Sequence, residues 1–455
     1  MAQSADQILS LTVILRAIQN ISEAHSALST GTDQDFEKSI ESLGNEVLNA
    51  TALPMEIRSD MEWTDFVDMH TKTGLRLEMI GLIYTIAARA SIFGLLKDAE
   101  QHDGFAQAVF RSSIACFEIS REVACETTDC MLWLSCDLLR LTTNARGDTH
   151  ESVWERTGVV SDIVFATGLH RESSITSDTP VWLAECRRKT WANIYQFDKF
   201  VATLFDRPPR ISKRYSDCHM PLELTDDELL GDRRKFEEAC SKLMPSGWSI
   251  EAKLCSATWV RLRYIWTAFR EEVLEYPFRL LTAETVAGLK VVAERLETQL
   301  ESLPLILRYS REIWDSGSST NICHMSGICH LLYLQSKLHI YHMLEKSNTS
   351  YRGSLLSTAA EVVRIVIHMG SVQHRADHVR HDNSYVMLYH GLPAVAALVQ
   401  IASRNGLHGL PEGLSRPKII RDLSVFIYNL ETICAPDDAN YTVCVCKQPA
   451  PSLGL

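Results

Sequence analysis

The chain has 455 residues, of which 46% are hydrophobic and 8% aromatic, which is enough for one large or two medium globular units with a substantial core. The formal net charge is −12, whereas a protein that binds nucleic acid by itself normally carries a basic patch or a basic domain. The densest basic groups, 187–189, 207–214 and 233–235, are short and have acidic neighbours. We interpret them as solvated faces or internal ion-pair partners, which argues against a nucleic-acid surface.

The 13 cysteines are scattered along the chain without a pairing rhythm. No secretory signal precedes them, because the apolar run 8–18 lacks a basic flank and is interrupted by Arg16. No apolar run approaches the ~20 residues that are needed to cross a bilayer. We therefore expect an intracellular chain with reduced thiols and no membrane partner.

Helical periodicity dominates the sequence. Segment 1–60 mixes polar and apolar residues and is expected to form a helical arm or the remnant of a linker. After it, apolar residues recur three and four positions apart, which places one face of each helix against a core. The clearest stripes are Val160, Ile163, Val164 and Thr167; Leu183, Arg187, Thr190, Trp191 and Ile194; Leu331, Leu334, Leu338 and Tyr341; and Leu356, Ala360, Val363 and Ile367. Strand-like alternation is almost absent, so the pattern predicts an all-α fold, a large multi-helix, bundle-like domain.

Several helix borders are also predicted. Gly168 should end one helix, because glycine tolerates a positive φ. Asp178-Thr179-Pro180 supplies a capping side chain and a proline at the first position of the next helix. Later breaks are expected at Pro304, 316–319, 347–353 and 404–417.

Compact structural zinc sites are usually marked by two C-x-x-C pairs. This sequence contains no C-x-x-C, and the nearest approach is Cys444-Val445-Cys446. We therefore expect no zinc or other cofactor in this chain.

Three histidines are the candidate ligands for a transition metal. His374, His378 and His381 would share one face if their segment is helical. His339 and His342 form a second, smaller pair. The interpretation that we prefer is a polar helix end or loop rich in His, Arg and Asp.

The size, acidity and helical pattern of the chain are also those of an isoprenoid cyclase, an enzyme that holds magnesium with a D-D-x-x-D/E helix. The nearest segment is Asp226-Asp227-Glu228-Leu229-Leu230, where Leu230 stands in place of the last carboxylate. A capped, solvated acidic turn fits this segment better. The sequence also has no G-x-S-x-G, Walker A or G-x-G-x-x-G motif. No catalytic or cofactor-binding residue is therefore assigned, and we do not expect an enzyme.

Segment 153–221 carries the most specific pattern in the chain. A helix ends near 167–171, and a second helix contains an E-x-R-R-x-x-W motif. The motif and the residues that follow it are Glu185, Arg187, Arg188, Trp191, Asp198, Arg207 and Pro208. This succession resembles the middle homology region of fungal-specific transcription factors, the regulatory domain that usually follows a binuclear zinc cluster.

Spacing suggests what these residues do. Trp191 and Asp198 are seven positions apart and share a helix face, so the carboxylate lies near the core and needs a cation or hydrogen-bond donors. Arg171 and Arg207 are the candidate partners. We expect structural ion pairing at these positions rather than ligand contact. The family usually has glycine before Arg-Pro, and this sequence has Asp206 there.

Two further segments are similar to the same family. Residues 73–82 resemble its early "TG-x-LRWE-x-x-GL" helix, with Leu77 in the tryptophan position. Residues 419–426 and 438–444 resemble its late "DLS-x-F … DANY-x-x-C" segment. The resemblance runs from about residue 53 to residue 444. It implies a regulatory domain over 61–446, followed by a disordered tail over 447–455.

The resemblance implies a nuclear regulator of a fungal metabolic gene set, secondary metabolism included. Family members carry zinc in a domain that this sequence lacks, so DNA contact would be indirect or through a missing N-terminal domain. The chain is then either part of a longer factor or a stand-alone regulator. Expected partners are other transcription factors or coregulators, a second chain in a homo- or heterodimer, and a small-molecule effector. The alternative is a helical metal- or diphosphate-dependent enzyme of secondary metabolism.

Overall fold

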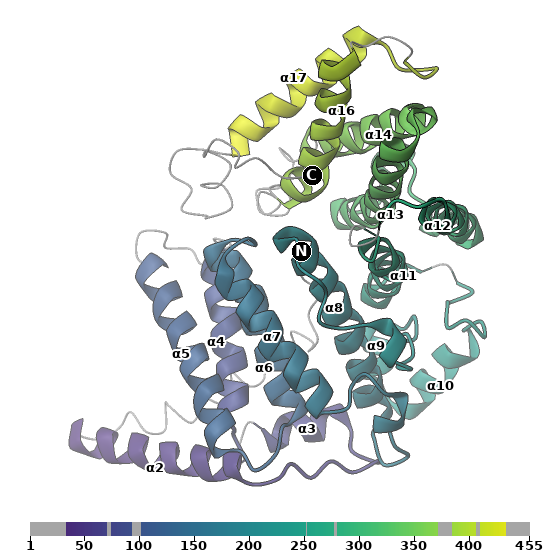
Figure 1. Cartoon of the computed structure of the whole chain (residues 1–455). Helices are drawn as coiled ribbons and strands as arrows, with labels where there is room; N and C mark the ends of the chain where they lie inside the picture. Colours follow the sequence, from purple (N-terminus) through teal and green to yellow (C-terminus); the bar gives the residue numbers. More distant parts are fainter. Residues whose placement is uncertain are drawn as a thin grey trace. The chain divides into compact units, whose positions relative to one another are not determined.

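The computed structural model describes residues 33–70, 74–92, 102–251, 253–276, 280–371, 385–405 and 410–433 (Figure 1). Within these ranges the chain is helical, and its only β-type pairing is an isolated bridge between Leu243 and Ser249. The all-α prediction is therefore confirmed. No described helix is both long and apolar enough to cross a membrane.

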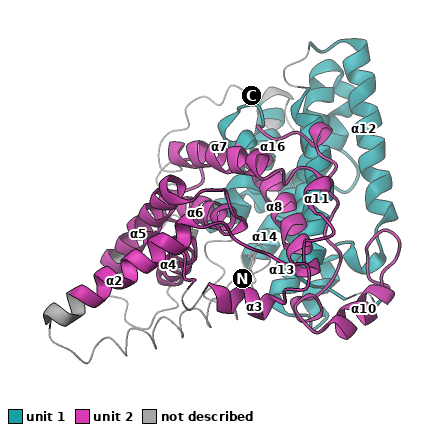
Figure 2. Ribbon diagram, turned by 90° about the horizontal axis from the view of Figure 1, so that it is seen from below, with its two compact units in different colours: residues 1–6, 202–209, 251–455 teal, residues 7–201, 210–250 magenta. Residues whose placement is uncertain are grey.

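The chain divides into two compact units, each with its own core (Figure 2). The N-terminal unit comprises residues 7–201 and 210–250, and the C-terminal unit comprises residues 1–6, 202–209 and 251–455.

The described helices of the N-terminal unit are α2 Asp33–Ala52, α3 Trp63–Met69, α4 Leu77–Ile92, α5 His102–Val123, α6 Asp129–Arg146, α7 Glu151–Ala166, α8 Val181–Phe205, α9 Asp226–Leu229 and α10 Arg233–Ser241, with 3₁₀ turns η3 Glu172–Ser174 and η4 Lys213–Tyr215. The last residues of α8 belong to the C-terminal unit.

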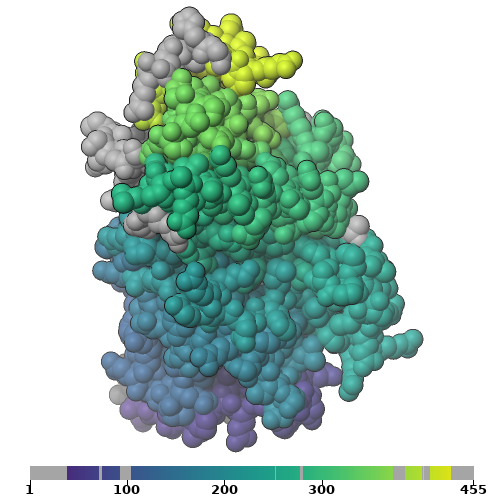
Figure 3. All heavy atoms as spheres, turned by 45° about the vertical axis from the view of Figure 1, so that its right-hand side comes forward, coloured from purple at the N-terminus to yellow at the C-terminus, as the bar shows by residue number. Residues whose placement is uncertain are grey.

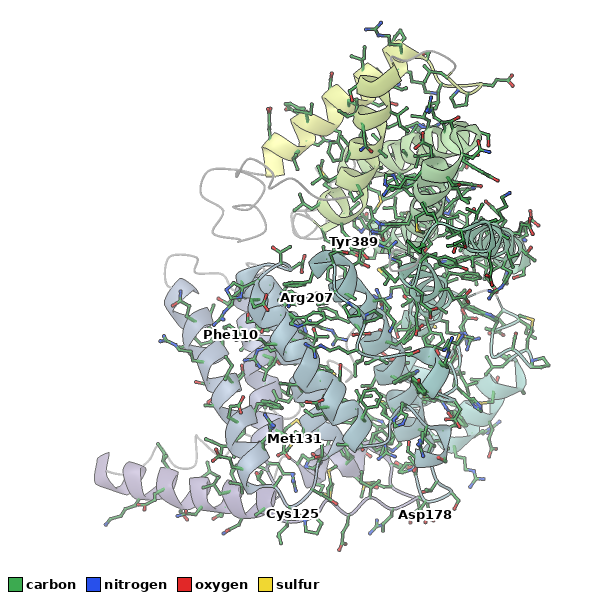
Figure 4. The ribbon with its side chains drawn as sticks, viewed as in Figure 1. Phe110, Cys125, Met131, Asp178, Arg207 and Tyr389 are labelled. Carbon is green, nitrogen blue, oxygen red and sulfur yellow. The ribbon has the colours of Figure 1, made fainter. Side chains whose placement is uncertain are left out.

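Helix α6 lies at the centre of the N-terminal unit and contacts α4, α5 and α7. Its residues from Asp129 to Leu139 are all buried, as expected for a helix that is surrounded on every side. Helices α4 and α6 approach closely at Gly81, where an added Cβ would lie 2.6 Å from the Leu134 side chain. Phe110 of α5 packs against the neighbouring cluster of Ala88, Val109 and Leu141 (Figure 4).

The described helices of the C-terminal unit are α11 Ser256–Leu274, α12 Ala283–Ser302, α13 Thr320–Ser347, α14 Arg352–Ser371, the π-helical segment η10 Val386–Gly391, α16 Leu392–Asn405 and α17 Arg416–Ile433, with 3₁₀ turns η5 Leu305–Leu307, η6 Arg311–Asp315 and η7 Thr349–Tyr351. Helix α13 is the central helix and contacts α11, α12 and α14. Helix α14 also contacts α16 and α17, and Figure 3 shows α17 in yellow beside their lighter green.

Several predicted borders are confirmed. Gly168 has a φ of +68° and follows α7, and the Leu169 amide donates to the Val164 carbonyl at 3.1 Å, which closes the helix as a Schellman motif does. Helix α12 ends just before Pro304, and Ser319 caps α13 by accepting from the Ile322 amide. Helix α8 starts at Val181, one residue later than predicted, with the Pro180 carbonyl accepting from the Ala184 amide at 2.9 Å.

Candidate functional site

The first half of α8 carries an arginine that joins three elements of the N-terminal unit. Arg187 donates to both carboxylate oxygens of Asp129, with Nε–Oδ1 3.0 Å and Nη2–Oδ2 2.8 Å. Asp129 is the first residue of α6, where the helix dipole favours a negative charge. Arg187 Nη1 also donates to the Ser174 carbonyl at 3.2 Å. This side chain therefore ties α8 to α6 and to the turn after α7.

The neighbouring Glu185 and Arg188 tie α8 to the segment that follows it. Glu185 is buried, accepts from Arg188 Nη1 at 2.5 Å and accepts from the Leu222 amide at 2.7 Å. Arg188 also donates to Glu172, which accepts from the His219 amide at 2.9 Å. Burial alone would raise the pKa of Glu172, but the hydrogen bonds from Arg188 and the His219 amide, with the Arg188 charge, hold that pKa below its usual value.

The second half of α8 holds a buried ion pair. Asp198 and Lys199 are each 1% exposed, and Lys199 Nζ lies 2.9 Å from Asp198 Oδ2. Asp198 accepts from the Arg210 and Ile211 amides at 3.0 Å each, and Lys199 donates to the Ile211 carbonyl. The Lys199 ammonium also lies 4.0 Å from the centre of the Tyr195 ring, which stacks on the fully buried Trp191.

The partners predicted for Asp198 were wrong. Its cation is the adjacent Lys199, whereas the Arg171 Nε donates to His170 and the Arg207 guanidinium lies over the Phe205 ring at 5.2 Å. The error has a simple cause, because spacing on α8 identifies a carboxylate near the core but does not identify what folds against it.

The turn before Arg207-Pro208 uses a left-handed residue. Asp206 has a φ of +49°, and among the described residues no other non-glycine residue has a positive φ. The Arg207 amide donates to the Ala202 carbonyl at 3.0 Å, which is the bond that closes a Schellman motif. Asp206 thus adopts the left-handed conformation that glycine adopts most easily. It does so at the position where the family usually has glycine. Figure 4 labels Arg207 at this turn.

The early family-like segment fixes the end of α2. Arg76 is buried, and its Nη atoms donate at 2.8 Å to the carbonyls of Ala50, Thr51 and Leu53. It also pairs with the fully buried Glu78 at 3.2 Å. These carbonyls lie at the C-terminal end of a helix, where such groups lack intrahelical donors and where a cation is favourable.

The acidic turn after Pro221 is a helix cap, as the sequence predicted. The Thr225 hydroxyl accepts from the Glu228 amide at 3.2 Å, and the Glu228 carboxylate accepts from the Thr225 amide at 2.8 Å. Asp226 pairs with Lys189 at 3.1 Å. Together with the pairs of Arg187 and Arg188, this bond makes the whole basic group 187–189 an internal ion-pair partner.

The candidate metal ligands His374, His378 and His381 lie outside the described residues, as do 438–444 and Cys444-Val445-Cys446. Among the side chains that the structure describes, no three His, Cys, Asp or Glu residues are grouped as a metal ion would require.

A second buried polar cluster, in the C-terminal unit, was not predicted. Arg270 of α11 is 5% exposed and contacts the Thr203 hydroxyl and His339 Nδ1. His390 of η10 is 1% exposed, and the charge of Arg270 acts on it. The sequence marked His339 only as one of a histidine pair. No sequence signal brings Arg270 and His390 together, because they belong to different helices far apart in the chain.

Comparison with known proteins assigns the segment that contains the α8 ion pairs to a protein family. A family model described as the fungal specific transcription factor domain matches residues 95–257. This range contains the ion pairs of α8 and also the Arg207-Pro208 turn, so the whole E-x-R-R-x-x-W region is covered.

Two curated proteins are similar to part of the chain. The Zn(2)-C6 fungal-type transcription factor pigI of Monascus ruber is 25% identical over 156 residues, which are 33% of this chain and 18% of that protein. The Zn(2)-C6 fungal-type transcription factor mpsB of Macrophomina phaseolina (strain MS6) is 28% identical over 99 residues, 22% of this chain and 12% of that protein. The matched part therefore spans less than a fifth of each relative. No solved structure matches the chain. The family model therefore identifies a fungal specific transcription factor domain at residues 95–257 of this chain, and both similar proteins are fungal-type transcription factors.

Proposed function

We propose that this chain is a regulator of transcription that acts on a fungal metabolic gene set, through a regulatory and interaction domain. The observation that carries the proposal is the fungal specific transcription factor domain at 95–257, and two Zn(2)-C6 fungal-type transcription factors are also similar to part of this chain. The family supports a nuclear location and partners among transcription factors or coregulators. It gives no support to an enzyme.

The charges of the domain support a module that does not bind DNA by itself. Arg187, Arg188 and Lys189 each pair with a carboxylate of the same unit, so they are not available to phosphates. The sequence has a net charge of −12 and no C-x-x-C pair. We infer that the residues of the α8 motif hold the domain together and that DNA is reached through a partner or another domain.

A tethering experiment tests the regulatory role. The chain, fused to an unrelated DNA-binding domain in a fungal host, should change the output of a reporter gene that carries the matching site. Trp191→Ala, which empties a fully buried position, should abolish the effect, whereas Arg233→Ala at an exposed ion pair should preserve it. A fusion that accumulates in the nucleus and leaves the reporter unchanged would contradict the proposal.

Two measurements on the purified chain test the remaining parts. We expect weak, salt-sensitive binding to DNA without sequence preference. Tight, sequence-specific binding would contradict the inference that the chain does not recognise DNA by itself. We also expect metal analysis to find no stoichiometric zinc or iron. Bound metal that is lost in the His378→Ala, His381→Ala double variant would favour the enzyme alternative instead.

A further inference from the structure

The Arg270 cluster contains a buried cation whose neighbours are all neutral. Arg270 Nε and Nη2 each lie 3.3 Å from the single hydroxyl oxygen of Thr203, and Nη1 lies 2.6 Å from His339 Nδ1. Tyr389 also hydrogen-bonds to the guanidinium. Within the part of the chain that the structure describes, no carboxylate is among the groups that act on Arg270.

A buried charge is stable only when it is paired and hydrogen-bonded. The other buried arginines described above follow this rule, since Arg76 pairs with Glu78 and Arg187 with Asp129. Arg270 differs in the use of its Nε–Nη2 edge, which fits two carboxylate oxygens but here meets one hydroxyl oxygen at long distance. Among the described residues, therefore, no negative charge meets this edge of the guanidinium.

His390 is a second, independent sign of a missing ligand. It is 1% exposed, and neither of its ring nitrogens has a hydrogen-bond partner. It lies on η10, where the helix widens to π geometry, and such single-turn π segments are frequent at functional sites. The Tyr389 carbonyl in this segment accepts from the Gln335 side chain at 3.2 Å, so the distortion itself is stabilised by α13. Figure 4 labels Tyr389, which directly precedes His390 in the chain.

We propose that Arg270 and His390 bind the carboxylate of a small monocarboxylic acid with an apolar body. The carboxylate would accept from the Nε–Nη2 edge of Arg270, and an N–H of His390 would complete its bonds.

The charges and the surroundings define the class of ligand. Burial, and then the charge of Arg270, lower the pKa of both His339 and His390 to about 3, so both imidazoles are neutral at physiological pH. One guanidinium therefore balances one negative charge, which fits a monocarboxylate and disfavours a phosphate dianion. The rings of Tyr385 and Tyr389 stack at 5.4 Å and both contact the His390 ring edge-on, which provides an aromatic surface for the apolar body.

Thermal unfolding of the purified full chain with matched probes tests this inference. Hexanoate and benzoate should raise the Tm by about 3 °C or more as they saturate the site. Hexanamide and benzamide, which have the same bodies without the charge, should not raise it, and inorganic phosphate at equal ionic strength should not either. No rise with either carboxylate, or an equal rise with phosphate or with the amides, would overturn the proposal.

Three variants locate the effect. Arg270→Met should remove the response to carboxylates and leave the Tm of the free protein unchanged or higher, because it removes an uncompensated buried charge. His390→Phe should weaken binding about tenfold, by the loss of one hydrogen bond to a charged group. Arg295→Met, which removes a half-exposed pair with Glu272, is the matched control and should respond like the unchanged chain.

The alternative is a counter-ion from the chain itself, at Asp377 or Asp382 in segment 372–384, which lies outside the described residues. In that case Arg270→Met would lower the Tm of the free protein, and Asp377→Asn or Asp382→Asn would lower it by a similar amount. This outcome would overturn the ligand site. The measurements use binding to the isolated chain, so their result is independent of the proposed role in transcription. If both proposals hold, the acid is the effector of the regulator.

Discussion

Asp198 shows how much one buried carboxylate can organise. It accepts from Lys199 and from two backbone amides, and these bonds fix the Arg210-Ile211 segment against α8. Asn in its place keeps the shape but has one acceptor atom instead of two and no charge for Lys199. We expect Asp198→Asn to lower the free energy of unfolding by about 3–5 kcal/mol, as measured by urea titration followed by circular dichroism.

The companion double variant separates the charge from the hydrogen bonds. Asp198→Asn with Lys199→Met removes both charges, and part of the lost stability should return. A loss below about 1 kcal/mol in the single variant would mean that this ion pair does not hold the domain together.

Asp206 allows a prediction with the opposite sign. Its φ of +49° is a conformation that costs an L-residue roughly 1 kcal/mol, and glycine has no such cost. The side chain is exposed, so little contact is lost on its removal. We expect Asp206→Gly to raise stability by about 0.5–1 kcal/mol and Asp206→Val to lower it by more than 1 kcal/mol.

Asp206→Asn is the control for this position, because asparagine tolerates the left-handed region about as well as aspartate. Its Tm should equal that of the unchanged chain. If the glycine variant were less stable than the asparagine variant, the strain at this turn would be smaller than the entropy that glycine adds to the unfolded chain.

At the scale of elements, Arg76 decides whether α2 stays attached to the N-terminal unit. It bonds three carbonyls at the end of α2 and also neutralises Glu78, whose carboxylate accepts from the Thr128 hydroxyl at 3.3 Å. Arg76→Met removes both functions, and we expect a loss of about 3–5 kcal/mol. Limited proteolysis should then cleave faster between residues 53 and 60, which lead out of α2.

A second substitution distinguishes the two functions of Arg76. In the Arg76→Met, Glu78→Met double variant no charge is left unpaired, so most of the stability should return. The carbonyls of α2 still lack their donor, so fast cleavage at 53–60 should persist. Slow cleavage in the double variant would show that α2 is held by other contacts.

At the scale of the whole molecule, the sequence predicts what is local. The spacing of apolar residues predicted the helices. Helix ends were predicted from Gly168 and from the acidic turn that Thr225 caps, and the family was predicted from the motif on α8. The pairs that build the clusters are not local: Arg187 and Asp129 are 58 positions apart, and Arg270 and His339 are 69 apart. A helical pattern shows which side chains face inward but not which neighbour they meet, so the partner of Asp198 was wrong and the Arg270 cluster was missed.

The buried histidines should make both units less stable in mild acid, although in the N-terminal unit burial raises the pKa of Asp148 to about 7, and this group opposes part of the loss. Burial is the main cause that lowers the pKa of His70 to about 4 in the N-terminal unit, and of His339 and His390 to about 3 in the C-terminal unit. In the unfolded chain these groups titrate near 6.5. Between pH 6.5 and about 4 the unfolded state therefore binds more protons than the folded state, and stability falls as the pH falls.

The expected slope is up to about 1.4 kcal/mol per pH unit for each histidine, and above pH 6.5 the three groups contribute no pH dependence. Urea titrations at pH 7.5, 6.0 and 5.0 measure it. His70→Met should reduce this slope by up to about 1.4 kcal/mol per pH unit, because the variant has no group to protonate at that site. His219→Gln, at an exposed histidine, should change the slope little. Equal stability at pH 7.5 and 5.0 would contradict the prediction, because it would mean that these imidazoles reach water in the folded protein.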